Sequence, residues 1–211
     1  MLEHVPLFSS LSVKELAELE AITHRRKVPK NSIVISEGDD SDCLYILASG
    51  RAVALRSDES GRQLIVNRFG PWDYFGEMSF FDGHARCATV MTKEACLLIT
   101  IQRNDFLTFA TRHPAVCWNV INALLEKLRH ATQQIEELAF LDVYGRFARF
   151  LTENQDKDGE VLERLTQQEL ADIIGTSRET VCRISNELIA GGYISRHKGK
   201  IAIHKKLPYK F

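Results

Sequence analysis

Apolar residues between positions 166 and 190 recur every three or four residues, the spacing of a buried helix face. Thr166 stands three residues before Glu169, a capping-box pattern that predicts a helix beginning at Thr166. Gly175 interrupts the pattern, after which Thr176 or Ser177 can cap a second helix. The apolar positions are Leu170, Ala171, Ile173 and Ile174 in the first helix, and Val181, Ile184, Leu188 and Ile189 in the second. Two helices joined by a tight turn make a helix-turn-helix.

Apolar and polar residues alternate after Gly191-Gly192, which ends the second helix. Residues 193–196 and 200–203 read as two strands around a hairpin turn at 197–199. The pattern therefore predicts a winged helix-turn-helix. Between 194 and 211 there are six Lys or Arg residues and no acid, a composition that favours contact with phosphates.

Short β-branched and apolar runs fill residues 30–102 and indicate strands. These runs cover 32–35, 44–47, 52–55, 64–66 and 96–99, and the turns between them are 37–40, 49–50, 58–61 and 69–71. Strands spaced this evenly predict a sandwich or roll. Ahead of them, Ser12 and Glu15 form another capping box, opening a helix expected to pack on the roll through Leu16, Leu19 and Ile22.

A long helix is predicted from about Pro114 to Asp142. Its apolar positions are 117, 120, 124, 128, 131, 135 and 138, with a mean step of about 3.5 residues. That is the period of a coiled-coil seam. A single amphipathic helix packed on its own domain fits the same spacing.

The formal net charge of −1 conceals two electrostatically different parts. Residues 161–211 carry nine basic and five acidic side chains, whereas the rest carries eighteen and twenty-three. A length of 211 residues and a hydrophobic content of 45% suit a globular protein of two domains.

The first two turns of the second helix carry side chains that can read base edges. Arg178 and Arg183 can each donate two hydrogen bonds to guanine, and Glu179 can accept from the cytosine amino group. A solvated helix face with a chance mixture of charges is the alternative. The position at the start of the second helix of a helix-turn-helix favours base reading.

Within the roll, Phe75-Gly76-Glu77-Met78 is followed by Ala85-Arg86-Cys87-Ala88. Gly76 allows backbone N–H groups to approach an anion, Arg86 can neutralise it, and Glu77 can accept from a sugar hydroxyl. A turn and a surface ion pair are the alternative interpretation.

Other features narrow the class of protein. The first residues lack a signal-peptide pattern and no apolar stretch approaches the ~20 residues of a membrane span, so a cytoplasmic protein without membrane contact is expected. The five cysteines (43, 87, 96, 117 and 182) form no C-x-x-C pair, so no metal site is expected, and most should be reduced core residues. With no nucleophile beside His and carboxylate, no H-E-x-x-H and no P-loop, an enzyme is not expected.

Four motifs give the chain a family resemblance: F-G-E-M at 75–78, A-R-C-A at 85–88, L-A-F-L-D-V at 138–143 and T-S-R-E-T-V-C-R at 176–183. In their order and spacing the chain resembles the cyclic-AMP receptor protein family of bacterial regulators, which includes the fumarate-nitrate regulators. The resemblance covers essentially the whole chain. It implies an α+β fold with an N-terminal cyclic-nucleotide-binding-type β-roll (jelly roll), a long dimerisation helix and a C-terminal winged helix-turn-helix, divided at 1–112, 113–142 and 143–211.

The resemblance also implies a ligand site. In the family, the segment matching 76–88 is a phosphate-binding cassette, where Glu77 would hold the ribose and Arg86 the cyclic phosphate. The ligand-binding residues carried over are Gly76, Glu77, Met78, Arg86, Cys87 and Thr132. Cyclic AMP as an allosteric effector is the leading expectation, with no required cofactor. Ala85, Cys87 and Ala131 depart from the usual pattern and leave the base open.

For DNA, the resemblance implies a homodimer reading palindromic TGTGA-like half-sites in double-stranded DNA and working with RNA polymerase. The DNA-binding residues are Thr166, Gln168, Ser177, Arg178, Glu179, Thr180 and Arg183, of which Thr166 and Gln168 match phosphate-holding positions. A hinge at 141–143 would orient the second helix when ligand favours one state.

Three alternatives share this scaffold. One is a redox, haem or gas sensor acting through residues such as Cys87 or His84, although no cysteine precedes Cys43 to supply the four-cysteine cluster of the fumarate-nitrate type. Another is a site for an unrelated anion. The third is a constitutive DNA-binding protein with an empty roll.

Overall fold

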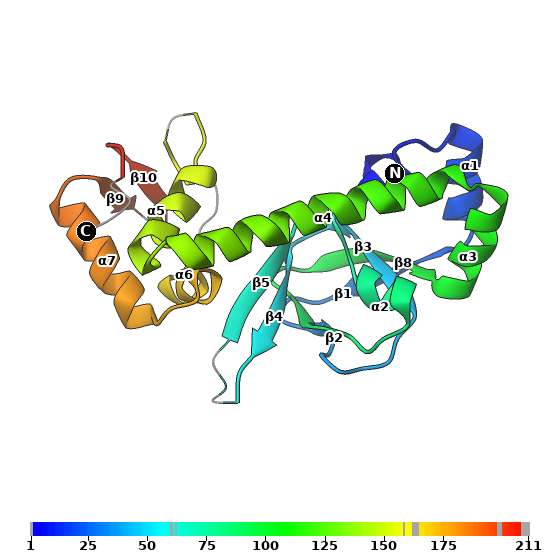
Figure 1. Cartoon of the computed structure of the whole chain (residues 1–211), viewed down its shortest axis with the longest axis horizontal. Coiled ribbons are helices and arrows are strands. Elements are labelled where there is room, and N and C mark those ends of the chain that lie inside the picture. Colours follow the sequence, from blue (N-terminus) through cyan, green and yellow to red (C-terminus); the bar gives the residue numbers. More distant parts are fainter. Residues whose placement is uncertain are drawn as a thin grey trace. The chain divides into compact units, whose positions relative to one another are not determined.

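The computed structural model describes residues 2–59, 61, 63–157, 159–161, 165–197 and 200–207. The chain divides into two compact units, Met1–Leu128 and Arg129–Phe211, and the boundary falls within the long helix α4, Ala115–Phe140. Helices and strands occur in both units (Figure 1), which confirms the α+β class. The three-part division at 112 and 142 stays a prediction.

The first unit contains two four-stranded antiparallel sheets, ordered β1-β8-β3-β6 and β2-β7-β4-β5. The strands are β1 Thr23–Val28, β2 Ile33–Ile35, β3 Cys43–Ser49, β4 Ala52–Ser57, β5 Gln63–Phe69, β6 Tyr74–Phe75, β7 Thr89–Thr92 and β8 Cys96–Gln102. Side chains from both sheets, among them Leu47, Ala54 and Leu98, meet in one buried cluster. The predicted roll is confirmed.

Helical segments surround a neighbouring apolar cluster that contains Phe8, Leu19, Phe80 and Phe109. These segments are η1 Leu2–His4, η2 Pro6–Phe8, α1 Val13–Glu20, α2 Glu77–Asp82, α3 Arg103–Arg112 and the first part of α4. The capping box that opens α1 is present. The helix ends at Glu20, so the expectation that it extends to Ile22 was wrong; Ile22 still packs on the cluster, one residue before β1.

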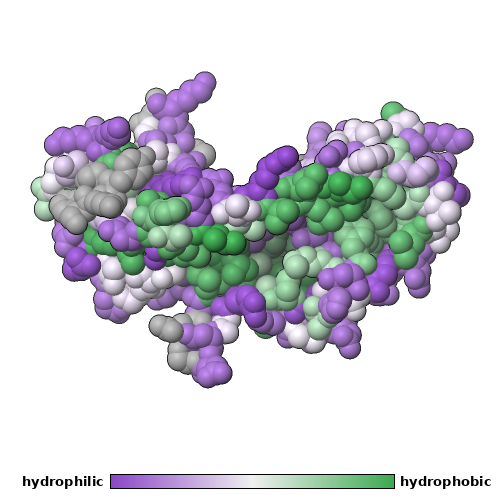
Figure 2. All heavy atoms as spheres, in the orientation of Figure 1, coloured by the Kyte–Doolittle hydropathy of each residue, from purple (hydrophilic) through white to green (hydrophobic). Residues whose placement is uncertain are grey.

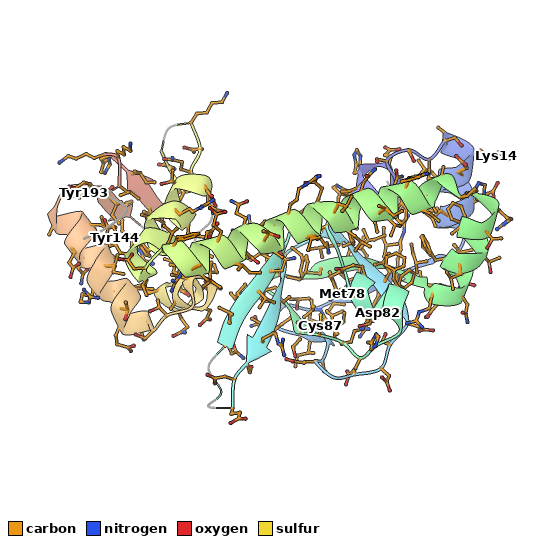
Figure 3. All side chains as sticks on the ribbon, viewed as in Figure 1. Lys14, Met78, Asp82, Cys87, Tyr144 and Tyr193 are labelled. Carbon is orange, nitrogen blue, oxygen red and sulfur yellow. The ribbon has the colours of Figure 1, made fainter. Side chains whose placement is uncertain are left out.

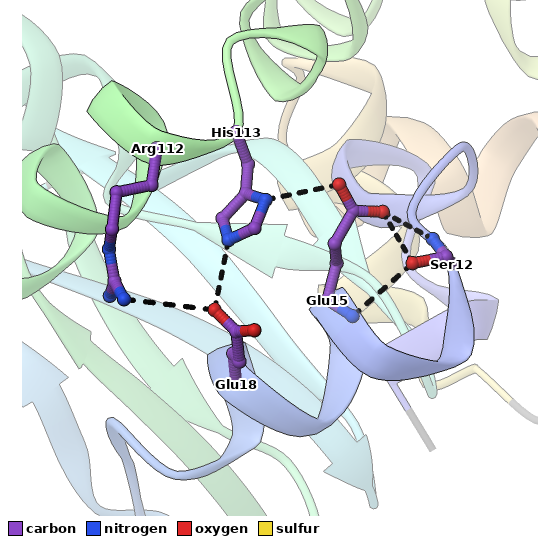
Figure 4. Close-up of polar contacts among 5 residues, drawn as sticks. All are labelled: Ser12, Glu15, Glu18, Arg112 and His113. Carbon is purple, nitrogen blue, oxygen red and sulfur yellow. Dashed lines mark hydrogen bonds and ion pairs between the residues drawn. The ribbon is translucent and has the colours of Figure 1, made fainter.

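His113 connects α1 to the junction between α3 and α4 through polar contacts (Figure 4). Its Nδ1 lies 3.1 Å from Glu15 Oε1, and its Nε2 lies 3.0 Å from Glu18 Oε2. Arg112 lies 3.8 Å from the same Glu18 oxygen, and the Phe109 ring lies 4.5 Å from the imidazole, centre to centre. The start of α4 is therefore held by polar contacts as well as by the apolar cluster.

One face of α4 packs inward in the first unit. Val116 is fully buried, and Val120 and Ala123 pack on the same cluster. Val120 of the predicted seam thus packs partly on this unit's own core, whereas the seam positions Leu124 and Leu128 are exposed, and the intermolecular seam stays a prediction. The exposed apolar residues of α4 in this unit are Trp118, Ile121, Leu124, Leu125 and Leu128, part of the apolar surface in Figure 2.

The second unit has its own core. Helices α5 Val143–Glu153, α6 Gln167–Ile174 and α7 Arg178–Ala190 pack with strands β9 Ile194–His197 and β10 Lys200–Ile203, which pair as an antiparallel hairpin. The helix-turn-helix and the strands of the wing are confirmed; Lys198 and Gly199 of the predicted turn lie outside the described residues. Gly175 ends α6 with a φ of 72°, and Ser177, not Thr176, caps α7.

The cysteines differ from their expected placement. Cys43 and Cys96 are buried, but Cys87 and Cys117 are exposed and Cys182 is half-buried, so the expectation that most are core residues was wrong. All five are free thiols. Among the described residues, no helix combines the length and the apolar character that crossing a bilayer requires.

Candidate ligand site and nucleic-acid interface

Gly76 joins β6 to α2 and makes room for Arg86. Its φ of 80° is a left-handed conformation that favours glycine. A Cβ built there would lie 2.5 Å from Arg86 Nη1. The Arg103 guanidinium donates to the carbonyls of Ser79 and Phe80 at the other end of α2. The turn and the short helix are thus held at both ends.

Arg86 is a buried cation surrounded by neutral acceptors. Its side chain is 3% exposed, and its Nη1 donates to the Gly76 carbonyl at 2.6 Å. Its Nη2 donates to Ser41 Oγ at 2.8 Å and to the Cys43 carbonyl at 2.6 Å. Within the described part of the chain, no carboxylate forms an ion pair with this guanidinium, and its Nε has no hydrogen-bond partner. A buried charge without a counterion favours an anionic ligand.

Glu77, the first residue of α2, is 8% exposed. Its Oε1 lies 3.0 Å from Lys127 Nζ, which in turn lies 4.3 Å from the centre of the Tyr74 ring. Burial, with the Glu77 charge as a smaller contribution, raises the pKa of Tyr74 to about 12. Lys127 is not among the ligand-binding residues expected from the sequence. Its helix spacing alone carried no signal of a contact with position 77.

Met78 and Cys87 bring two exposed sulfur atoms together (Figure 3). The Cys87 thiol lies 3.6 Å from the Met78 sulfur. His84 is also exposed and lies 3.4 Å from Asp82. No group of three or more His, Cys, Asp or Glu side chains suited to a metal ion occurs among the described residues. Thr132 lies in the second unit, so its assignment to the ligand stays a prediction.

The first two turns of α7 present the predicted base-reading side chains to solvent. Ser177 Oγ accepts from the Thr180 backbone N–H at 3.2 Å and lies 3.1 Å from Thr180 Oγ1. Arg178, Glu179 and Arg183 are exposed. The pKa of Glu179 is lowered, first by a hydrogen bond from its own backbone N–H and then by Ser177 and Arg178, which keeps it an acceptor at neutral pH.

Several of these groups have intramolecular partners. Arg183 Nη1 lies 3.2 Å from Glu187 Oε1 on the next turn. Thr166 is exposed, and its Oγ1 donates to Glu169 Oε2 at 3.0 Å as part of the capping box. Gln168, also exposed, donates to Asp172 at 2.7 Å. Binding of DNA by Arg183 or Gln168 would replace their contacts with Glu187 and Asp172 by contacts with DNA.

The segment between α4 and α5 is joined to the helix-turn-helix by Arg146. Its Nη1 donates to the Leu141 carbonyl at 2.9 Å, and its Nε donates to the Ile174 carbonyl at 3.1 Å, at the end of α6. Asp142 caps α5, because its Oδ1 accepts from the Gly145 backbone N–H at 2.7 Å. The predicted hinge residues Leu141 and Asp142 therefore contact α5, and Arg146 links this part of α5 to the end of α6.

Two family models match the chain. A cyclic nucleotide-binding domain matches residues 25–113, and a Crp-like helix-turn-helix domain matches residues 145–206. The cyclic AMP receptor protein of Thermus thermophilus is 30% identical over 95% of this chain and 93% of its own length. The cAMP-activated global transcriptional regulator CRP of Pasteurella multocida is 32% identical over 86% of this chain and 90% of its own length.

Solved structures agree with these matches. The c-di-GMP responsive global regulator CLP of Xanthomonas campestris is similar with a TM-score of 0.81 and 25% identity, covering 92% of this chain and all of that one. The catabolite activator protein of Thermus thermophilus is similar with a TM-score of 0.60 and 30% identity, covering 94% and 93%. The chain belongs to the cyclic-AMP receptor protein family of transcription regulators, with a cyclic-nucleotide-binding-type domain followed by a DNA-binding helix-turn-helix.

Proposed function

We propose that this protein is a homodimeric, sequence-specific DNA-binding regulator whose affinity for DNA responds to a cyclic nucleotide, cyclic AMP, bound in the β-roll. The ligand assignment rests on the burial and the hydrogen-bond partners of Arg86. This buried guanidinium is held by two carbonyls and a hydroxyl, with no counterion and with its Nε unpartnered among the described residues. A cyclic phosphate supplies the missing negative charge and a further acceptor.

The neighbouring groups suit the rest of a nucleotide. Glu77 would accept from the ribose hydroxyl, and Lys127 keeps its carboxylate charge balanced before the sugar arrives. Met78 and Cys87 are exposed beside this segment and would contact the ligand, while Thr132 would face the base. The ribose hydroxyl and the Lys127 ammonium would compete for the Glu77 carboxylate. Ligand binding would therefore change the contact between Glu77 and Lys127 of α4.

Calorimetry on the full chain tests the effector. Cyclic AMP should bind the wild type, and Arg86→Gln should lose binding, because the amide brings no charge to the phosphate. Arg25→Gln is the matched control, since Arg25 pairs with Glu20 at the surface of the same unit. Cyclic GMP and cyclic di-GMP are run in parallel. Binding of either in place of cyclic AMP overturns the choice of nucleotide, and heat from none of the three overturns the nucleotide assignment.

The DNA contacts follow from the exposed turn of α7. Arg178, Glu179 and Arg183 would read base edges in TGTGA-like half-sites of double-stranded DNA, about 34 Å apart in a two-fold symmetric complex. Thr166 and Gln168 would contact phosphates, which fix the register of α7 without reading sequence, and Ser177 and Thr180 would contact DNA beside the base-reading side chains. RNA polymerase is the proposed partner at the promoter.

Selection of binding sites from random DNA tests this assignment. Glu179→Ala should relax the preference at one base pair of each half-site by about 1–3 kcal/mol, whereas Lys200→Gln on the wing should weaken all sequences alike. An unchanged preference at every position in Glu179→Ala would show that this carboxylate reads no base.

A further inference from the structure

The junction between α4 and α5 has a charged side-chain contact as well as the backbone contacts of Asp142 and Arg146. Arg149, in the second turn of α5, lies 3.2 Å from Glu137 Oε1 in the last turn of α4. The same Arg149 Nε lies 2.8 Å from Glu153 Oε1, four residues on in α5. One guanidinium is thus shared by two carboxylates, one on each side of the junction.

The two carboxylates differ in their surroundings. Glu137 is 22% exposed and Glu153 is 51% exposed, while Arg149 lies between them at 31%. Glu153 is on the same helix as Arg149, so their contact does not depend on the angle between α4 and α5. The contact with Glu137 does depend on it.

Helix α5 is joined to the recognition helix through the core of the second unit. Phe147 and Leu151 of α5 share one buried cluster with Leu170 of α6 and Val181 of α7. A change in the angle between α4 and α5 would therefore carry α7 with it.

We propose that Arg149 is a positioning residue for DNA binding, and that its contact with Glu137 sets the balance between two orientations of the helix-turn-helix. This inference rests on the proposed function. When the angle changes, Arg149 leaves Glu137, whereas its contact with Glu153 within α5 is the same in both orientations. Opening the junction then costs only one partly exposed ion pair, and the two orientations stay close enough in free energy for a ligand to select one.

The test compares Glu137→Gln with the matched control Glu153→Gln in the full chain, with Arg149→Lys as the conservative variant. The DNA dissociation constant is measured with and without saturating cyclic AMP, on the sequence that the wild type selects. Glu137→Gln should change the ratio of the two constants by about two- to five-fold, while Glu153→Gln leaves the ratio unchanged and Arg149→Lys stays near the wild type. Equal ratios in the two glutamine variants would overturn the proposal.

Hydrogen exchange of the ligand-free protein separates this inference from the proposed function. Amides of residues 141–149 should exchange about two- to five-fold faster in Glu137→Gln than in Glu153→Gln, because only the first variant releases α5 from α4. This holds whether or not cyclic AMP binds. If the DNA dissociation constant of the wild type does not change with cyclic AMP, the proposed function is contradicted. Identical amide exchange rates in Glu137→Gln and Glu153→Gln contradict the role of Arg149.

Discussion

The ammonium of Lys127 lies 3.0 Å from the Glu77 carboxylate, and this contact joins α4 to the first residue of α2. Glu77 is almost fully buried, and Lys127 is about one-third exposed and packs over the Tyr74 ring. A buried carboxylate needs a partner, because desolvation penalises its charged form. Lys127 therefore has a structural role before any ligand binds.

Replacing Lys127 by Met should lower the free energy of unfolding by about 1–3 kcal/mol, a value between those of exposed and buried pairs. Urea denaturation measures it. In Glu77→Gln/Lys127→Met both charges are gone, so the double variant should lose less than the sum of the two single changes. Strict additivity would contradict the coupling between the two side chains.

Gly76→Ala should damage both the β6–α2 turn and the placement of Arg86. A left-handed Ala costs about 1–2 kcal/mol, and here the new methyl also meets Arg86 Nη1. Gly38→Ala is the matched control, because Gly38 has a φ of 86° but nothing within 4 Å of a built Cβ. Thermal unfolding should show a larger loss for Gly76→Ala, and only that variant should lose nucleotide affinity in calorimetry. Equal losses of thermal stability and nucleotide affinity in the two variants would mean that the contact with Arg86 has no effect beyond backbone strain.

The features predicted from the sequence are those encoded by neighbouring residues. The capping boxes of α1 and α6 each need a hydroxyl and a carboxylate three residues apart, and both formed. Strand β1 was missed because His24, Arg25, Arg26 and Lys27 give it a continuous exposed polar run at a sheet edge, with no alternation to recognise.

The candidate site was predicted by residue type, but its partners were not. Gly76, Glu77 and Arg86 come together, as the motifs indicated. Ser41 lies 45 residues before Arg86, and Lys127 lies 50 residues after Glu77, so these partners carry no local signal. The inward face of α4 likewise depends on the tertiary cluster around Val120, which heptad spacing cannot distinguish from an intermolecular seam.

The stability of the α1 attachment should depend on acidic pH. The pKa of Glu15 is lowered, first by hydrogen bonds from the Ser12 hydroxyl and backbone and to a smaller extent by His113. Because the folded-state pKa is below the unfolded value, this contribution is complete above the unfolded value and is lost as the pH falls through the folded one. Denaturation across that range should show a shallower acid loss in Ser12→Ala than in the wild type. Ser9→Ala should keep the wild-type slope, because the Ser9 hydroxyl donates to the Pro6 carbonyl and not to Glu15.

The proposed homodimer should depend on the exposed apolar face of α4 and not on the inward one. In a two-fold symmetric pair of helices, Leu125→Glu places a carboxylate in each copy of the seam, where burial and like charge oppose association. Sedimentation equilibrium should give the monomer mass for Leu125→Glu and the dimer mass for Val13→Glu, a control on an exposed apolar residue of α1. Val120→Ala should cost roughly 1 kcal/mol of stability while leaving the dimer mass unchanged, because Val120 packs on its own unit. A dimer that survives Leu125→Glu but dissociates in Val120→Ala would place the dimer contact on the inward face of α4 and contradict this prediction.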